Sequence, residues 1–64
     1  MYYVLYSPSR KMYLNSDHEW GSFEQAVKSY ERYDAVHSMN YYLDMVDAES
    51  DIKVVGPCEE GEEP

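Results

Sequence analysis

The sequence predicts an α+β fold: a single small domain with the order β-β-α-α-β, in which two short helices cover one face of a three-stranded antiparallel sheet. Three observations predict it. Residues 2–14 contain two runs rich in aromatic and β-branched side chains around a Ser-Pro turn. Residues 23–46 repeat apolar side chains at helical spacing. A last β-branched run, residues 52–55, ends at Gly56-Pro57.

The first two strands are predicted to form a hairpin. Residues 2–6 are aromatic and β-branched, and they run into Ser7-Pro8, which is typical of a turn. Residues 11–14 alternate polar and apolar side chains, as expected of a strand with one buried face. Residues 7–10 are therefore the connection between two antiparallel strands.

The helical region is predicted to be two helices. A serine followed three residues later by glutamine is a capping box, so the first helix begins at about Phe23. Trp20 is expected to pack the start of that helix on the sheet or, alternatively, to be an exposed anchor for a partner. The second helix is expected over about 35–47, with Asp34 as its N-cap. At about 100° per residue the two apolar stripes point in opposite directions, so we expect a break or sharp kink within 31–34.

The last strand, 52–55, follows both helices and most simply pairs with the first strand. Side-chain alternation then divides the sheet into two faces. The face expected to pack on the helices contains Tyr3, Leu5, Met12, Leu14, Ile52 and Val54. The other face, expected to be open to water, contains Tyr2, Val4, Tyr6, Lys11, Tyr13, Lys53 and Val55. The domain is predicted to span residues 1–57, and residues 58–64 to be a flexible acidic tail.

The size and composition of the chain exclude several classes of protein. A chain of 64 residues buries only about 60% of the surface that it exposes when unfolded, which leaves no room for a deep pocket between domains. A single cysteine, Cys58, cannot form an intrachain disulfide, and this fits a reducing cytosol. No apolar run reaches the ~20 residues that span a bilayer, and residues 1–6 lack the basic start of a signal peptide. We therefore expect a cytoplasmic protein.

The formal charge of −8 comes from the second half of the chain. Residues 1–33 carry as many basic as acidic side chains. From residue 34 onward the single base is Lys53, and the acids are Asp34, Asp44, Asp47, Glu49, Asp51, Glu59, Glu60, Glu62 and Glu63. This charge repels nucleic-acid phosphates and anionic lipids, so it favours a basic protein as the partner.

The acidic run at the end of the second helix is the candidate binding site. Carboxylates there crowd a helix C-terminus that already carries partial negative charge, which costs stability without a structural return. Such local inconsistencies concentrate at functional sites. The carboxylates would pair with lysine or arginine, and two tyrosines would add buried contact area. The predicted partner-binding residues are Tyr41, Tyr42, Asp44, Asp47, Glu49 and Asp51. The alternative interpretation is a solvated acidic end that keeps the protein soluble.

No catalytic, metal or cofactor site is predicted. Residues 47–51 have the spacing of a calcium loop, but Ile52 and Cys58 stand where such a loop needs glycine and glutamate. His18 and His37 have no second histidine or cysteine three or four residues away, so zinc is not expected. Cys58 is expected in the tail, where nothing would hold a base against its thiol. We therefore expect no enzyme and no cofactor.

Four features of the chain form a recognisable layout: a start at Met1–Leu5 that opens directly into a strand, a hairpin ending near Leu14, a short helical middle, and a strand at 52–55 before an acidic tail. This layout resembles that of small acidic bacteriophage-encoded proteins that inhibit host machinery. In size and charge the chain is similar to anti-CRISPR proteins, uracil-DNA glycosylase inhibitors and inhibitors of bacterial RNA polymerase. The resemblance covers the whole chain at the level of pattern.

The resemblance implies a non-enzymatic inhibitor in the cytoplasm of a bacterial host cell. It would bind a basic nucleic-acid-handling protein, such as a CRISPR effector or a polymerase, through the acidic helix and loop, as a nucleic-acid mimic. No direct nucleic-acid or membrane partner is expected. The alternative is a small phage or bacterial structural or regulatory protein that homodimerises through its tyrosine-rich sheet face, with Tyr2, Tyr6 and Tyr13 at the contact.

Overall fold

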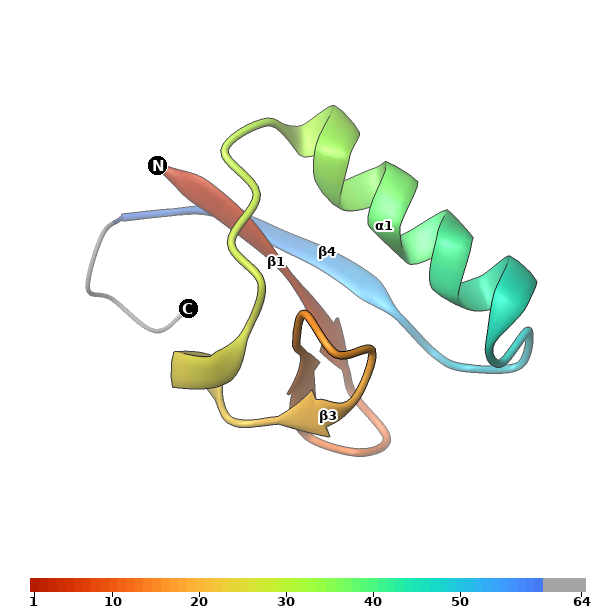
Figure 1. Cartoon of the computed structure of the whole chain (residues 1–64). Coiled ribbons are helices and arrows are strands. Elements are labelled where there is room, and N and C mark those ends of the chain that lie inside the picture. Colours follow the sequence, from red (N-terminus) through yellow and green to blue (C-terminus); the bar gives the residue numbers. More distant parts are fainter. Residues whose placement is uncertain (60–64) are drawn as a thin grey trace.

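The chain folds around a four-stranded antiparallel sheet with the strand order β3-β2-β1-β4. The structure is a computed structural model and describes residues 1–59 (Figure 1). Strand β1 (Tyr2–Ser7) lies at the centre, between β2 (Met12–Leu14) and β4 (Lys53–Cys58). Strand β3 (Trp20–Gly21) forms the edge beyond β2. The helical elements are a 3₁₀ turn, η1 (Phe23–Gln25), and one long helix, α1 (Arg32–Met45).

The predicted hairpin and the pairing of the last strand with the first are both confirmed. Tyr6 of β1 lies opposite Tyr13 of β2. On the other side of β1, Leu5 lies opposite Val54 of β4. The central place of β1 fits its burial: most of its residues are buried, so its backbone groups need hydrogen-bond partners on both edges.

Strand β4 continues through Gly56-Pro57, where the sequence predicts that it ends. Gly56 has a φ of +146°, which L side chains rarely adopt. A Cβ at Gly56 would lie 2.7 Å from Cδ2 of Tyr3 and 2.8 Å from the carbonyl oxygen of Tyr2. Glycine is therefore required where β4 passes close to β1. Pro57 is tolerated because β4 is an edge strand, where the missing N–H breaks no ladder.

The prediction of three strands and two helices is wrong, since within residues 1–59 the sheet has four strands and there is one α-helix. The additional strand, β3, pairs Trp20 with Leu14 and Gly21 with Tyr13. A strand of two residues is too short to produce an alternating pattern. Trp20 packs in the core against Tyr42 of α1, so the expectation that it packs the start of the first helix is wrong.

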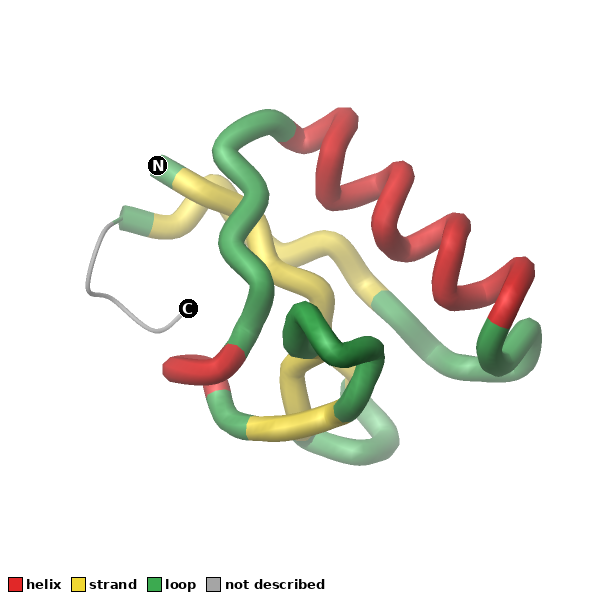
Figure 2. Tube along the Cα trace, in the orientation of Figure 1, coloured by secondary structure: helices red, strands yellow, loops and turns green. Residues whose placement is uncertain are grey.

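The predicted first helix is reduced to η1, and an extended segment, residues 26–31, leads from it to α1 (Figure 2). Strand β2 pairs with only the last residues of β1, which leaves the first half of that edge open. The extended segment fills the gap: Ser29 exchanges two backbone hydrogen bonds with Tyr3, and Val27 N–H donates to the carbonyl of Leu14. A helix here would leave those edge groups of β1 and β2 unpaired.

The expected interruption before the second helix is present, but it lies over residues 26–31 instead of within 31–34, and residues 32–34 are helical. Helix α1 begins at Arg32 and ends at Met45, against a prediction of about 35–47. The N-cap is Glu31, and Asp34 lies within the first turn instead of capping it. An acidic side chain in the first turn is favourable because the amino end of a helix carries partial positive charge.

The core is divided between the two faces of the sheet. On one face, the cluster of Tyr2, Val4, Ala26 and Cys58 packs with Phe23, Tyr13 and Val55. On the other, the cluster of Leu5, Leu14, Ala35 and Tyr42 packs with Tyr3, Trp20, Met39, Ile52 and Val54. The prediction that both helical segments cover the same face is therefore wrong: α1 covers one face and η1 packs on the other. The residues predicted to face a helix do so, except that Met12 is exposed.

The second face is also less open than the sequence suggests. Tyr2 is fully buried, because the rings of Phe23 and Tyr30 pack on it at centroid distances of 6.3 and 6.5 Å. Cys58 is buried in β4 opposite Tyr2, so it belongs to the domain and not to a tail. The rest of the predicted tail, residues 60–64, lies outside the described residues.

Candidate functional site

Two of the four carboxylates predicted to bind a partner are bonded to the chain itself. Asp51 lies against the turn that joins β1 and β2. Its Oδ1 accepts hydrogen bonds from Ser7 Oγ at 2.6 Å and Ser9 Oγ at 2.8 Å. Its Oδ2 accepts one from the Ser9 backbone N–H at 2.8 Å. These bonds, first those from Ser7 and then those from Ser9, lower the pKa of Asp51 to about 2.

Asp47 is engaged in the same region. Its carboxylate accepts the backbone N–H of Glu49 and the hydroxyl of Ser50, and these bonds lower its pKa. Arg10 lies between the two aspartates, with N–O distances of 3.5 Å to Asp47 and 3.7 Å to Asp51. We call the five residues Ser7, Ser9, Arg10, Asp47 and Asp51 the Asp51 clamp. The clamp ties the hairpin turn to the link before β4, so Asp47 and Asp51 are bonded within the chain although both side chains stay partly exposed.

The two adjacent tyrosines of the predicted site have different environments. Tyr42 is only 5% exposed. Its hydroxyl accepts a hydrogen bond from Trp20 Nε1 at 3.0 Å, and the two rings meet edge to face. Tyr41 is 49% exposed, and its ring edge meets His18 at a centroid distance of 5.3 Å. Tyr41 is available to a partner over much of its surface, whereas Tyr42 is a core residue with little exposed surface.

The exposed face of α1 gathers the remaining candidate side chains. Asp34, His37, Tyr41 and Asp44 lie three or four residues apart and all are exposed, so they occupy roughly 80° of the helix circumference. Tyr33, 75% exposed, stacks on His37 and extends this surface. We call these five residues the α1 stripe. From residue 33 to residue 52 the sequence contains no lysine or arginine.

Of the predicted set, Tyr41, Asp44 and Glu49 are exposed and are not part of the Asp51 clamp. Tyr33, His37 and Asp34 are exposed beside Tyr41 and Asp44 on α1, and they were not among the site residues predicted from the sequence. Glu49 is exposed on the turn after α1. The spacing of Tyr33, His37 and Tyr41, each four residues after the last, is a sequence signal that could have identified the stripe.

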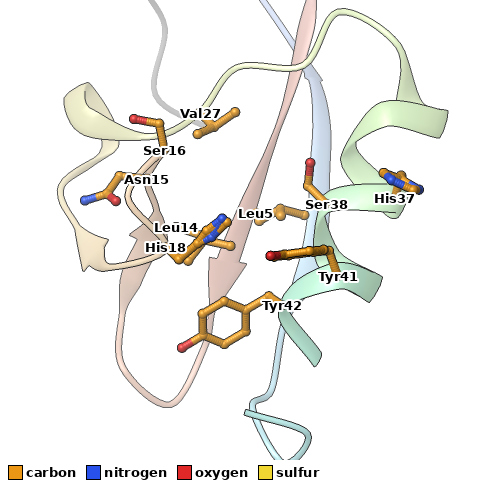
Figure 3. A pocket seen from close by; sticks show the side chains of 10 residues that line it. All are labelled: Leu5, Leu14, Asn15, Ser16, His18, Val27, His37, Ser38, Tyr41 and Tyr42. Carbon is orange, nitrogen blue, oxygen red and sulfur yellow. The ribbon is translucent and has the colours of Figure 1, made fainter. Parts of the chain in front are cut away.

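A cavity of about 490 Å³ lies beside the α1 stripe, between α1 and the loop that joins β2 to β3 (Figure 3). Its lining residues are Leu5, Leu14, Asn15, Ser16, His18, Val27, His37, Ser38, Tyr41 and Tyr42. Leu14 and His18 face Tyr41 and Tyr42 across it in Figure 3. The sequence does not predict the cavity, because nothing local indicates that residues 15–18 lie against α1.

The loop that carries His18 is held in place by Asn15. The side-chain Oδ1 of Asn15 accepts the backbone N–H groups of Asp17 and Glu19, and its backbone pairs with Glu19 and His18. His18 has a φ of 60°, in the left-handed region that histidine visits more often than most residues. This wall of the cavity is therefore formed by a bonded loop.

Of the three tyrosines in the alternative dimer face, only Tyr6 and Tyr13 have exposed surface. Their rings lie 4.9 Å apart and both are half-buried, whereas Tyr2 is covered by the chain itself. The expectation that Tyr2 is open to a second copy is wrong.

The described residues also bear on metal binding, thiol chemistry and membrane insertion. Within residues 1–59, no three histidine, cysteine or acidic side chains are placed to hold a metal ion. Burial raises the pKa of the Cys58 thiol, which disfavours the nucleophilic thiolate. None of the helices in this part of the chain has the length and hydrophobicity to cross a bilayer.

Comparison with protein-family models, with curated proteins and with solved structures finds no match to this chain.

Proposed function

We propose that the chain is a small non-enzymatic inhibitor that binds a basic surface of a nucleic-acid-handling protein through the α1 stripe. The observation that carries this proposal is the composition of that stripe. Exposed aromatic rings at Tyr33 and Tyr41 alternate with carboxylates at Asp34 and Asp44, and no cation lies within the surrounding segment, residues 33–52. Tyrosine is enriched at the energetic centres of protein interfaces, and carboxylates around it select a cationic partner.

The distribution of charge supports the same partner. The formal charge of −8 arises after residue 33, and the Asp51 clamp uses Arg10 to neutralise part of it at the far end of α1. Within residues 1–59, neither carboxylate of the α1 stripe forms an ion pair, and both side chains are exposed, so their negative field extends into the solvent. A basic groove built for nucleic-acid phosphates would be attracted to this side of the molecule over about 8–10 Å at physiological salt.

The specific form that we propose is an inhibitor of a CRISPR effector or of another nucleic-acid enzyme in a bacterial cytoplasm. The support for this form is the layout of the chain and its one-sided charge. Such an inhibitor would occupy the groove that the enzyme uses for nucleic acid, and it needs no catalytic group of its own.

The test measures binding of the purified chain to a CRISPR effector nuclease and to a bacterial RNA polymerase, at several salt concentrations. For the target, we expect the affinity to fall steeply with salt and the double variant Asp34→Lys/Asp44→Lys to bind about tenfold more weakly or worse. A matched control, Glu24→Lys/Glu59→Lys, makes the same change of net charge at exposed positions outside α1.

The control separates a local site from a general charge effect. If both double variants lose affinity equally, the α1 stripe is not the site. If neither enzyme binds the chain, or if binding is insensitive to salt and to both variants, the proposed function is wrong.

A further inference from the structure

We propose that the cavity beside the α1 stripe receives an aromatic side chain that the basic partner presents between lysine or arginine residues. This inference rests on the proposed function and adds to it the kind of segment that is recognised. The cavity lies next to the stripe because Tyr41 belongs to both, so one partner segment can contact the two at once.

The cavity suits a neutral, apolar group. Leu5, Leu14 and Val27 contribute aliphatic surface, and Tyr41 and Tyr42 contribute rings. Among its lining residues, all within the described part of the chain, there is no carboxylate, lysine or arginine. A cationic side chain placed inside would lose water without gaining an ion pair, which is costly. An aromatic side chain gains instead, from burial and from edge-to-face contact with the tyrosines.

The volume and the walls also suit such a group. About 490 Å³ lies within the range of 300–1,000 Å³ that is typical of pockets for small-molecule ligands, so it has room for a single aromatic ring. Asn15 fixes the loop on one side, and the bond from Trp20 to Tyr42 fixes a ring on the other. The site is therefore largely formed before a partner arrives, and preformed sites lose less entropy on binding.

Exposed acidic residues near the cavity favour basic residues on either side of the partner's aromatic side chain. Asp17 and Glu19 are exposed on the loop, on either side of His18 in the sequence. Asp34 and Asp44 lie on α1 before and after the helical lining residues. His18, His37, Tyr41 and Tyr42 are the titratable groups among the lining residues, and Figure 3 shows Tyr41 between the two histidines.

Three of the five basic side chains of the chain lie away from the cavity. Arg10 is held in the Asp51 clamp, 4.8 Å from the centre of the Trp20 ring. Lys28 lies over the rings of Tyr2 and Phe23, which pack on the opposite face of the sheet. Arg32 is about 200° around the helix axis from Asp34, so its side chain leaves α1 on a different side from the α1 stripe. Exposed acidic residues thus lie next to the lining residues of a neutral cavity on both the loop and α1, and this arrangement is complementary to an aromatic residue with cationic neighbours.

The experiment uses the full chain and two blocked peptides: a phenylalanine with two lysines on each side, and the same peptide with alanine at the centre. Binding is measured by NMR titration of backbone amides and by the fluorescence of Trp20, the single tryptophan of the chain. We expect the phenylalanine peptide to bind about tenfold more tightly than the alanine peptide. Amide shifts should concentrate at residues 15–18 and 37–42.

Two variants separate the contributions. Ser38→Phe places a ring in the cavity and should abolish the preference for phenylalanine while leaving the salt-dependent binding of both peptides. Ser38→Leu fills less of the cavity and serves if the larger residue prevents folding, as judged by circular dichroism. Asp34→Asn/Asp44→Asn should weaken both peptides and preserve the preference for phenylalanine.

Each result decides between the two proposals. If the two peptides bind equally well and both are weakened by Asp34→Asn/Asp44→Asn, the charged stripe stands and the aromatic anchor is wrong. If the preference for phenylalanine is lost in Ser38→Phe but binding does not depend on salt, the anchor stands and its cationic flanks are wrong. If neither peptide binds at millimolar concentration, or if the preference survives in both Ser38 variants, the inference is overturned.

Discussion

Replacing Tyr42 tests whether this tyrosine is a core residue or part of the binding surface. The side chain is only 5% exposed, it accepts the Trp20 Nε1 hydrogen bond, and it packs in the cluster with Leu5, Leu14 and Ala35. Removal of a buried aromatic ring typically costs about 3–5 kcal/mol. A chain of 64 residues has a total stability of roughly 3–10 kcal/mol. We therefore expect Tyr42→Ala to be largely unfolded or close to it at 25 °C.

Tyr42→Phe keeps the ring and removes only the hydroxyl that accepts the bond from Trp20. Loss of one such hydrogen bond costs about 1 kcal/mol, which lowers the melting temperature of a domain of this size by about 4–8 °C. Tyr41→Ala is the matched control, because Tyr41 is 49% exposed and loss of its ring should cost about 1 kcal/mol or less.

The assay is urea and thermal unfolding, followed by Trp20 fluorescence and by near-ultraviolet circular dichroism. The expected order of destabilisation is Tyr42→Ala far above Tyr42→Phe and Tyr41→Ala. If Tyr41→Ala destabilises the chain as much as Tyr42→Ala, or if Tyr42→Ala leaves the unfolding transition unchanged, the assignment of Tyr42 to the core is refuted.

Four further predictions follow from other features of the structure. Because folding lowers the pKa of Asp51 to about 2, from 3.8, its contribution to stability is present above about pH 4 and is lost as the pH falls toward 2; acid unfolding of Asp51→Asn should lack this component, and an identical acid transition would contradict the clamp. Gly56→Ala should unfold at markedly lower urea concentration than the natural chain, since its Cβ would meet the backbone of β1; unchanged stability would refute the close approach. The buried thiol of Cys58 should react with a thiol reagent far more slowly in the native chain than in urea, and equal rates would contradict its burial. If the alternative of a homodimer is right, sedimentation will show an association that depends on concentration and that Tyr6→Lys abolishes; a monomer at all concentrations would exclude it.

Sequence patterns predicted the parts of the fold that depend on local signals. The hairpin turn at Ser7-Pro8 and the β-branched run at 52–55 were sufficient to place β1 beside both β2 and β4. The opposed phases of the two apolar stripes correctly excluded one continuous helix. These predictions hold because turn chemistry and periodicity act over a few residues.

The error over residues 23–30 has a physical cause in the tertiary structure. Apolar residues at helical spacing there equally suit a 3₁₀ turn followed by an extended segment. The extended segment is favoured over a helix because the backbone N–H and carbonyl of Tyr3 need hydrogen-bond partners, and Ser29 supplies both. A short β2 creates that need, and the length of a partner strand is not visible in the helical segment itself.

The candidate site was predicted only in part because charge alone does not distinguish a free carboxylate from a bonded one. Asp47 and Asp51 look as available in the sequence as Asp44. The structure shows that the turn containing Ser9 and Arg10 lies against them. The cost that the sequence assigned to acidic residues near the end of α1 is thus offset within the chain for two of them and not for Asp44.

The pairing of Val4 with Val55 has a consequence for the synthesis of the chain. At about 5–20 residues per second, a ribosome completes β4 roughly 3–10 s after β1 has been made. During this interval β1 is an apolar strand that lacks its longest partner. The extended segment that contains Ser29 emerges sooner and can pair with Tyr3 on the opposite edge. Residues 26–29 can therefore cover this second edge of β1 early, whereas the edge that pairs with β4 stays open to intermolecular pairing until β4 is made.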